Sequence, residues 1–161
     1  MAKKPEPKKR KLKFDNLDEM MADVRSLNEN GYVSHGSWTL GQSCGHIANW
    51  MRYPLDGYPV APLPIRMIFW VMKKTVVPGM KRKILAKGFK GGMMTAPDSV
   101  PKQDETSDQQ GVDQLQEVVD RVIAHEGELY PSPLFGEMDK QMHITVTLLH
   151  AEHHLGYLEP N

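Results

Sequence analysis

The sequence is short of cysteine and of net charge, and both shortages narrow the classes of protein that it can encode. A single cysteine, Cys44, excludes an internal disulfide framework and fits a reducing compartment. The 20 basic residues are balanced by 20 acidic ones, so no overall charge draws the chain to nucleic acid or to a membrane. The length of 161 residues suits one domain.

The sequence also lacks a long apolar run. Its most apolar stretch, PLPIRMIFWVMKKTVVPG (62–79), contains Arg66, Lys73 and Lys74. It is also shorter than the roughly 20 apolar residues that a membrane-spanning helix needs. The basic run KKPEPKKRKLK (3–13) lacks the apolar stretch of a secretory signal. We therefore expect a cytoplasmic protein without a membrane partner.

Two regions follow from the distribution of charge and apolar residues. Residues 1–14 are basic and broken by prolines, which predicts a disordered tail, and residues 15–161 form the domain. Contact between the tail and nucleic acid is the minor alternative, because a tail of this kind is usually solvated. We expect nucleic acid not to be a partner.

Helical periodicity dominates what the sequence does contain. Apolar residues recur at helical spacing in four segments: residues 16–30, 39–53, 112–127 and 137–157. The first two open with the spacing of a capping box, Asn16 with Glu19 and Thr39 with Gln42. Pro54 should bend or end the second helix near residue 53. No segment alternates convincingly with period two, so the sequence predicts an all-α four-helix bundle.

Residues 58–111 do not fit the four-segment pattern. Ile65 to Val76 has the character of an amphipathic or buried helix, and Pro78 could open a second short helix over residues 79–87. The polar stretch 91–111 is rich in turn-forming residues and predicts a long loop. We therefore expect a helical insert between the second and third helices of the bundle.

Three of the seven histidines fall within five residues of the last helical segment, LLHAEHHLGYL (148–158): His150, His153 and His154. His150 and His154 lie about 40° apart on a helical wheel, beside the apolar face, with a rise of about 6 Å between them. Two imidazoles at this spacing can converge on one metal ion. Zinc, nickel and ferrous iron all accept imidazole nitrogen.

A further ligand has to come from another segment. His46 in CGHIANW is the preferred candidate, and its neighbour Gly45 would let another element approach closely. On the wheel His46 points away from the apolar stripe of its helix, which suits either a polar cleft or an exposed surface. The other candidates are His35, His125 and Cys44. Cys44 lies on the apolar stripe and is better interpreted as a small core residue. Histidines held by hydrogen bonds, without a metal, remain the alternative.

The order of the motifs resembles a known family. The opening SWTLGQSCGHIANW (37–50) and the ending HAEHHLGYL (150–158) are similar to those of the DinB-like metal-binding four-helix bundles. The segments MRYPLDGYP (51–59) and SPLFG (132–136) are similar to an uncharacterised branch of that superfamily. The resemblance extends over nearly all of residues 15–158.

This resemblance implies that His46, His150 and His154 are the metal ligands, with His153 beside them. It also implies a homodimer, and in some related enzymes a low-molecular-weight thiol as cosubstrate. The chain departs from the wider family at Leu155, where an arginine is usual, and in the insert 58–111. Both departures weaken the inference of a shared substrate.

Two functions follow from these residues. The first is a divalent-metal-dependent enzyme acting on a small molecule, as a thiol-dependent S-transferase or a hydrolase. Its catalytic base is not identified: His153, Glu152 and His143 are candidates, and of these only His143 points well inward on the wheel. The alternative is a non-catalytic metal-binding or ligand-binding helical bundle.

Overall fold

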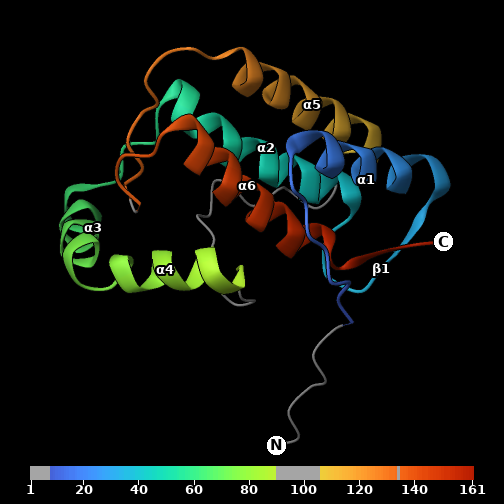
Figure 1. Ribbon diagram of the computed structural model, residues 1–161, viewed down its shortest axis with the longest axis horizontal. Coiled ribbons are helices and arrows are strands. Elements are labelled where there is room, and N and C mark those ends of the chain that lie inside the picture. Colours follow the sequence, from blue (N-terminus) through green and yellow to red (C-terminus); the bar gives the residue numbers. More distant parts are fainter. Residues whose placement is uncertain (1–7, 90–105, 134) are drawn as a thin grey trace, which may run out of the picture.

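Helices make up most of the computed structural model, which describes residues 8–89, 106–133 and 135–161 (Figure 1). The helices are α1 (Leu17–Asn30), α2 (Leu40–Asp56), α3 (Leu63–Thr75), α4 (Val77–Lys87), α5 (Asp108–Ala124) and α6 (Lys140–Leu155). Two strands, β1 (Tyr32–Ser34) and β2 (Leu158–Pro160), pair antiparallel. Within these ranges no helix combines the length and the apolar character needed to cross a membrane.

Side-chain caps fix where several of these helices begin. The Asn16 side chain accepts a hydrogen bond from the Glu19 backbone N–H at the start of α1. At α2 the capping box of Thr39 and Gln42 is complete in both directions, as its spacing predicts. A second complete box, which starts at Ser107, opens α5. Each box satisfies backbone N–H groups that the first helical turn leaves without a partner.

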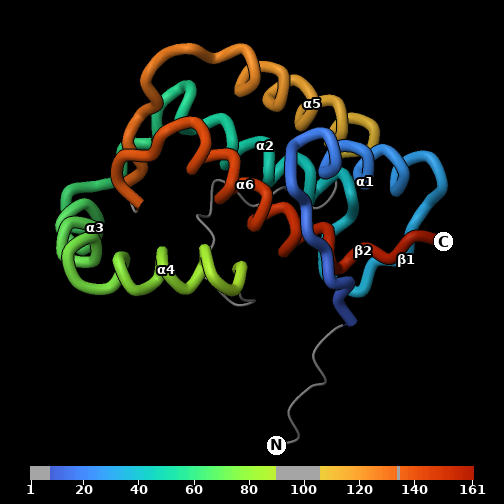
Figure 2. Tube along the Cα trace, viewed as in Figure 1, coloured from blue at the N-terminus to red at the C-terminus, as the bar shows by residue number. Residues whose placement is uncertain are grey.

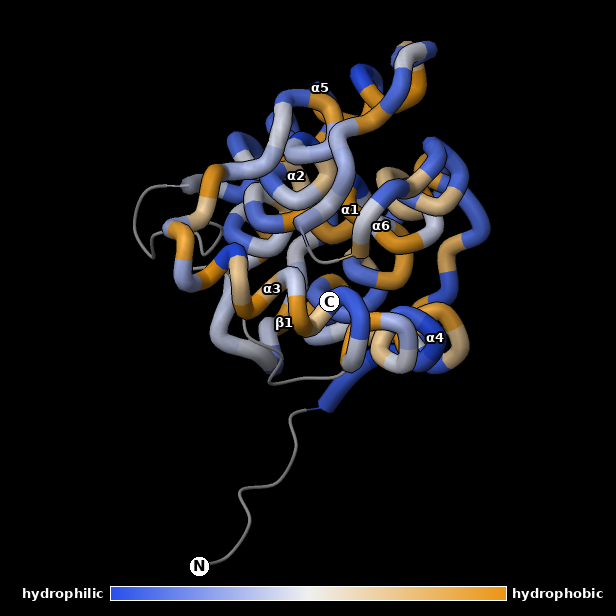
Figure 3. The backbone as a smooth tube through the Cα atoms, turned by 90° about the vertical axis from the view of Figure 1, so that its left-hand side faces the viewer, coloured by the Kyte–Doolittle hydropathy of each residue, from blue (hydrophilic) through white to orange (hydrophobic). Residues whose placement is uncertain are grey.

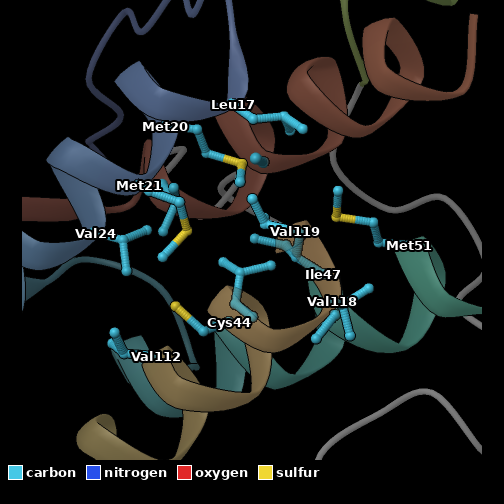
Figure 4. Packing of buried hydrophobic residues seen from close by; sticks show 14 of the residues in the cluster. Leu17, Met20, Met21, Val24, Cys44, Ile47, Met51, Val112, Val118 and Val119 are labelled. Carbon is cyan, nitrogen blue, oxygen red and sulfur yellow. The ribbon is translucent and has the colours of Figure 1, made fainter. Parts of the chain in front are cut away.

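One apolar core joins α1, α2, α5 and α6 (Figure 4). Each of these four predicted helical segments contributes side chains that are almost completely buried, among them Met20, Ile47, Leu115 and Leu155. The periodic stripes of the sequence therefore correspond to the faces that the helices bury. Leu158 of β2 closes the same core.

The closest approach between helices is that of α2 and α5, which run side by side (Figure 2). A Cβ added to Gly111 would lie 2.3 Å from the Gly41 carbonyl oxygen, and one added to Gly41 would lie 2.5 Å from the Ser107 carbonyl oxygen. Gly45, where the sequence suggested a close approach, faces only the end of the Gln114 side chain at 3.4 Å. Close packing thus occurs one turn earlier in α2 than expected.

The helices α3 and α4 lie on the side of α6 that faces away from α5 (Figures 1 and 2). They form the helical part of the predicted insert, with bounds within two residues of those expected. α4 packs beside α6 and has two buried residues, Val77 and Ile84, whereas α3 has none. The predicted loop 91–111 lies outside the described residues up to residue 105, and its last four residues are the first turn of α5.

Other expectations about element boundaries were wrong. α2 continues through Pro54 to Asp56, since a proline removes only its own N–H bond and Pro54 is buried and accepts a hydrogen bond from the Tyr130 N–H. α5 begins four residues early because Ser107 caps it. The two strands were missed because three residues are too few to show alternation.

Part of the segment assigned to the basic tail makes defined contacts. The Arg10 N–H donates to the Gly156 carbonyl oxygen at 2.7 Å, and its guanidinium forms a bidentate ion pair with Asp23. The Phe14 N–H donates to the Glu152 carboxylate at 2.8 Å. Residues 8–14 therefore connect α1 to the end of α6, and residues 1–7 lie outside the described part of the chain.

Candidate metal centre

Three imidazole rings from two distant segments meet between α2 and α6. Nε2 of His150 lies 3.2 Å from Nε2 of His46 and 3.0 Å from Nε2 of His154. One ring nitrogen of each histidine lies within 4.8 Å of the others. The structure thus brings together the three residues that the sequence proposed as ligands.

The helices themselves produce this convergence. His150 and His154 are one turn apart on α6, so both rings lie over the same face. His46 comes from the middle of α2, which packs against α6, and only 1% of its surface is exposed. Of the two surroundings that the helical wheel allowed for His46, the structure has the enclosed one.

Aromatic side chains enclose the three rings. Trp38, just before α2, stacks on His154 with ring centroids 4.9 Å apart and contacts His46 edge-on. Trp50 contacts His150 edge-on at 6.0 Å, and Phe89, just after α4, lies 5.2 Å from the same ring. The histidines therefore face one another inside a largely apolar wall.

Burial sets the charge of the C-terminal pair. Loss of hydration lowers the pKa of His150 well below its ordinary value, and the neighbouring His46 and His153 lower it further. Burial likewise lowers the pKa of His154, with His150 as the next cause. Both imidazoles are consequently neutral near pH 7, and a neutral imidazole is the form that binds a metal.

The chemistry of the three donors suits a divalent cation. In a tetrahedral zinc site with Zn–N bonds of about 2.0–2.1 Å, the ligand nitrogens lie about 3.3–3.4 Å apart. The two distances at His150 are close to that value. His46, His150 and His154 could therefore hold one metal ion, and three imidazoles suit zinc, nickel or iron better than calcium or magnesium.

His153 and His143, two of the three candidate bases, lie in different surroundings. His153 is next to the cluster, where its ring is 4.9 Å from that of His154 and its Nδ1 is 3.2 Å from the Phe89 carbonyl oxygen. His143 lies seven residues earlier than His150, about 10 Å along α6. It is buried, as the wheel predicts, but its Nε2 donates to the Met51 carbonyl oxygen at 3.1 Å.

The other proposed ligands do not join the cluster. His35 pairs with Glu159, and the ring of the partly exposed His125 contacts the Glu128 carbonyl oxygen. Cys44 is buried in the core, and burial raises the pKa of its thiol. Glu152, which was proposed as a base and not as a ligand, accepts the hydrogen bond from Phe14 described above.

Two residues around the cluster were not identified from the sequence. Trp38 belongs to the SWTLG motif, so that motif held a signal for it. Phe89 reaches His150 only because the insert folds back over α6, and no local pattern indicates this contact.

Comparison with known proteins places the chain in a family. No curated protein and no solved structure matches it. A family model described as "Protein of unknown function (DUF1569)" matches residues 6–161, which include both helices of the candidate metal centre. The chain therefore belongs to the DUF1569 family of proteins of unknown function.

Proposed function

We propose that this protein is a divalent-metal-dependent enzyme acting on a small molecule, built as a DinB-like four-helix bundle in which His46, His150 and His154 hold the ion. One observation carries the proposal: three imidazole nitrogens from segments 104 residues apart in sequence converge inside an aromatic wall. A purely structural zinc site normally uses four protein ligands, whereas a catalytic site uses three.

The reaction class follows from the coordination position that three protein ligands leave free on the ion. A divalent ion bound by three imidazoles lowers the pKa of a water or a thiol that reaches it, which makes either a nucleophile at neutral pH. Transfer of a small thiol to an electrophilic carbon, or hydrolysis, is the chemistry that we assign. Trp38, Trp50 and Phe89 would contribute by excluding bulk water and by binding the apolar part of a substrate.

His153 is the residue that we propose to accept a proton. A carbonyl oxygen can only accept, so we propose the tautomer of His153 that carries its proton on Nδ1 and donates to the Phe89 carbonyl oxygen at 3.2 Å. Nε2 of the same ring then keeps its lone pair. Lys9, whose Nζ is also 3.2 Å from that Nδ1, cannot donate to it in this tautomer.

A second candidate function is a non-catalytic bundle in which the ion ties α2 to α6. It is favoured by one observation: the cluster found among the described residues contains no carboxylate to act as a base. In this reading, the contact between His153 and the Phe89 carbonyl oxygen only orders the end of α4.

Metal content tests the site itself. We expect tag-free protein to bind one zinc or nickel ion per chain, measured by elemental analysis after dialysis. His46→Ala, His150→Ala and His154→Ala should each lower the affinity by more than about a hundredfold, because loss of a ligand exceeds the effect of losing a supporting residue. His125→Ala, which changes a partly exposed histidine outside the cluster, is the control. Equal metal binding by the wild type and all four variants would refute the site.

Turnover separates the enzyme from the scaffold. The metal-loaded protein is assayed with small thiols, such as cysteine and glutathione, and an activated aryl halide, and hydrolysis of activated esters is followed in parallel. We expect turnover that is abolished by His154→Ala. His153→Gln should retain the metal but lose about 10²–10⁴-fold in rate, the usual contribution of a general base. A fully loaded protein with no turnover in either assay supports the scaffold instead.

A further inference from the structure

The outer face of α3 is apolar, and no other described residue covers it. Leu63, Met67, Trp70 and Val71 are 71%, 70%, 60% and 51% exposed. These four residues follow one another at helical spacing and form a stripe along the helix. We call this stripe the outer face of α3. Figure 3 shows hydrophobic segments on α3 next to hydrophilic ones. Contiguous exposed apolar side chains of this kind mark an interaction surface.

The same region is strongly basic, although the whole chain is neutral. Residues 57–89 contain no Asp or Glu. They contain seven basic residues: Arg66, Lys73, Lys74, Lys81, Arg82, Lys83 and Lys87. The Lys74 ammonium lies over the Trp70 ring, 4.3 Å from its centre, and this cation–π contact places a charge directly on the apolar stripe. Apolar and cationic groups therefore share one side of α3.

A hollow of about 390 Å³ lies beside this face, between α3 and residues 58–61. Phe69 and Trp70 belong to its apolar lining, and Arg66 and Lys73 also border it. An apolar hollow with two cationic side chains suits an amphiphile with an anionic head, such as a phospholipid.

Three kinds of partner could cover such a surface: a second copy of the chain, nucleic acid or a lipid bilayer. The basic residues of α3 and α4 distinguish between them. A second copy of the chain docked through the same face would bring two sets of basic residues together, which is unfavourable. Nucleic acid would satisfy the lysines but would leave the aliphatic stripe in contact with phosphates or water. The surface of an anionic bilayer satisfies both kinds of group, because basic side chains meet the headgroups while apolar ones enter the boundary with the acyl chains.

We propose that α3 and α4 form a peripheral membrane-binding element, with the outer face of α3 lying in the plane of an anionic lipid surface. A helix of 13 residues is about 20 Å long, which suits an orientation along the surface rather than across it. This proposal departs from the expectation of no membrane partner, which rested on the balanced charge of the whole chain and on the lack of a membrane-spanning run. It does not depend on metal binding, since none of the proposed ligands lies on α3 or α4.

Sedimentation with vesicles tests this inference on the full chain. The probes are vesicles of phosphatidylcholine alone and vesicles in which phosphatidylglycerol replaces about a third of it, at low and high salt. We expect binding to the anionic vesicles only, and weaker binding at high salt because the charges are then screened. Equal binding to both vesicles, or binding to neither, would overturn the proposal.

Matched variants separate α3 from the N-terminal basic segment. Lys73→Glu with Lys74→Glu should weaken partitioning by about thirtyfold or more, because each basic residue near an anionic surface contributes about fivefold. Lys11→Glu with Lys13→Glu makes the same change of charge among exposed residues of the N-terminal segment and should have a clearly smaller effect. If the Lys11 and Lys13 variant instead lost more binding than the Lys73 and Lys74 variant, the N-terminal segment would be the binding element, and the proposal would be overturned.

A third variant tests whether the exposed apolar side chains of α3 contribute to vesicle binding. Met67→Ser with Val71→Ser keeps every charge and should weaken vesicle binding by about tenfold or more, since both side chains lose their burial in the bilayer. Both residues are exposed, so the fold should be retained, as circular dichroism would check. An unchanged affinity would overturn the proposal. Two further results would also overturn it. One is that the Ser variant converts a dimer to a monomer while no form of the protein binds vesicles, and the other is that the protein binds duplex DNA more tightly than vesicles.

Discussion

At the residue scale, His143 shows how a buried imidazole can join two helices without a metal. Its Nε2 donates to the Met51 carbonyl oxygen, so the last helix is bonded to the backbone of α2. Burial lowers the pKa of His143, and the hydrogen bond to Met51 opposes part of that shift. The ring is thus neutral in the folded protein near pH 7, and protonating it requires bringing a charge into the core.

This shift gives the free energy of unfolding a pH dependence with a definite sign. The folded-state pKa of His143 lies below the value of 6.5 for an exposed histidine. Above pH 6.5 the ring is neutral in both states and its contribution to stability is complete. As the pH falls below 6.5, the unfolded chain binds a proton that the folded chain does not, and stability is lost down to the folded-state pKa.

We therefore expect His143→Gln to flatten the decline of stability between pH 6.5 and 5, by up to about 1.4 kcal/mol per pH unit. Glutamine does not titrate and can still donate to the Met51 carbonyl oxygen. Urea unfolding of metal-free protein at several pH values measures the slope. His125→Gln is the control, since that histidine is partly exposed and lies outside the core. An identical slope for wild type and His143→Gln would show that His143 titrates normally.

Residue-level prediction from the sequence succeeded where chemistry is local. The spacing of His150 and His154 on one helix is enough to place both rings on one face. His46 could not be placed in the same way, because its wheel position allowed either a cleft or solvent, and only the packing of α2 on α6 decides between them. Phe89 depends on how the insert folds back, which no short pattern contains.

At the element scale, the contact between α2 and α5 depends on the absence of two side chains. Gly41 and Gly111 face each other, and a Cβ on Gly111 would also lie 2.5 Å from the Gly41 Cα. These neighbours are backbone atoms, which cannot rotate aside as a side chain can. Any larger residue at either position would push the two helices apart along the contact that carries the core residues Cys44 and Leu115.

Gly111→Ala should therefore destabilise the protein by about 2 kcal/mol or more, although alanine is the better helix former by about 1 kcal/mol. Gly45→Ala is the matched control on the same side of α2, where the only neighbour is the mobile end of Gln114 at 3.4 Å. It should be neutral or stabilising by up to about 1 kcal/mol. Chemical unfolding measures both, and similar values for the two variants would argue against a tight contact at Gly111.

The helices were predictable because their determinants lie within one or two turns. Capping residues and apolar stripes locate α1 and α2 from the sequence alone, and the structure adds only the exact ends. The prediction of helix ends failed where a capping residue outweighed the loop-like composition of the residues beside it. The polar residues after Ser107 resemble a loop, but the box that Ser107 forms with Gln110 makes them the first turn of α5. The strands are held by pairing between Tyr32 and Pro160, which are far apart in sequence.

At the scale of the whole molecule, the C-terminal segment is bonded to early parts of the chain at several points. β2 pairs with β1, the Arg10 N–H donates to the Gly156 carbonyl oxygen, and His143 donates to the Met51 carbonyl oxygen. The candidate metal centre adds a link of the same kind, since His46 and His150 are 104 residues apart. A ligand that binds these histidines only in their folded arrangement must stabilise the entire fold.

Zinc should accordingly raise the thermal unfolding midpoint of the intact protein. At a free concentration about a hundred times the dissociation constant, a single site contributes about 2.7 kcal/mol. For a chain of this length each kcal/mol raises the midpoint by about 2–4 °C, so we expect a shift of about 5–10 °C, reversed by a chelator. Calorimetry of wild type and of His154→Ala measures the difference. The variant keeps six of the seven histidines, and therefore nearly all nonspecific zinc binding, so an equal shift in both proteins would place the stabilising ion elsewhere.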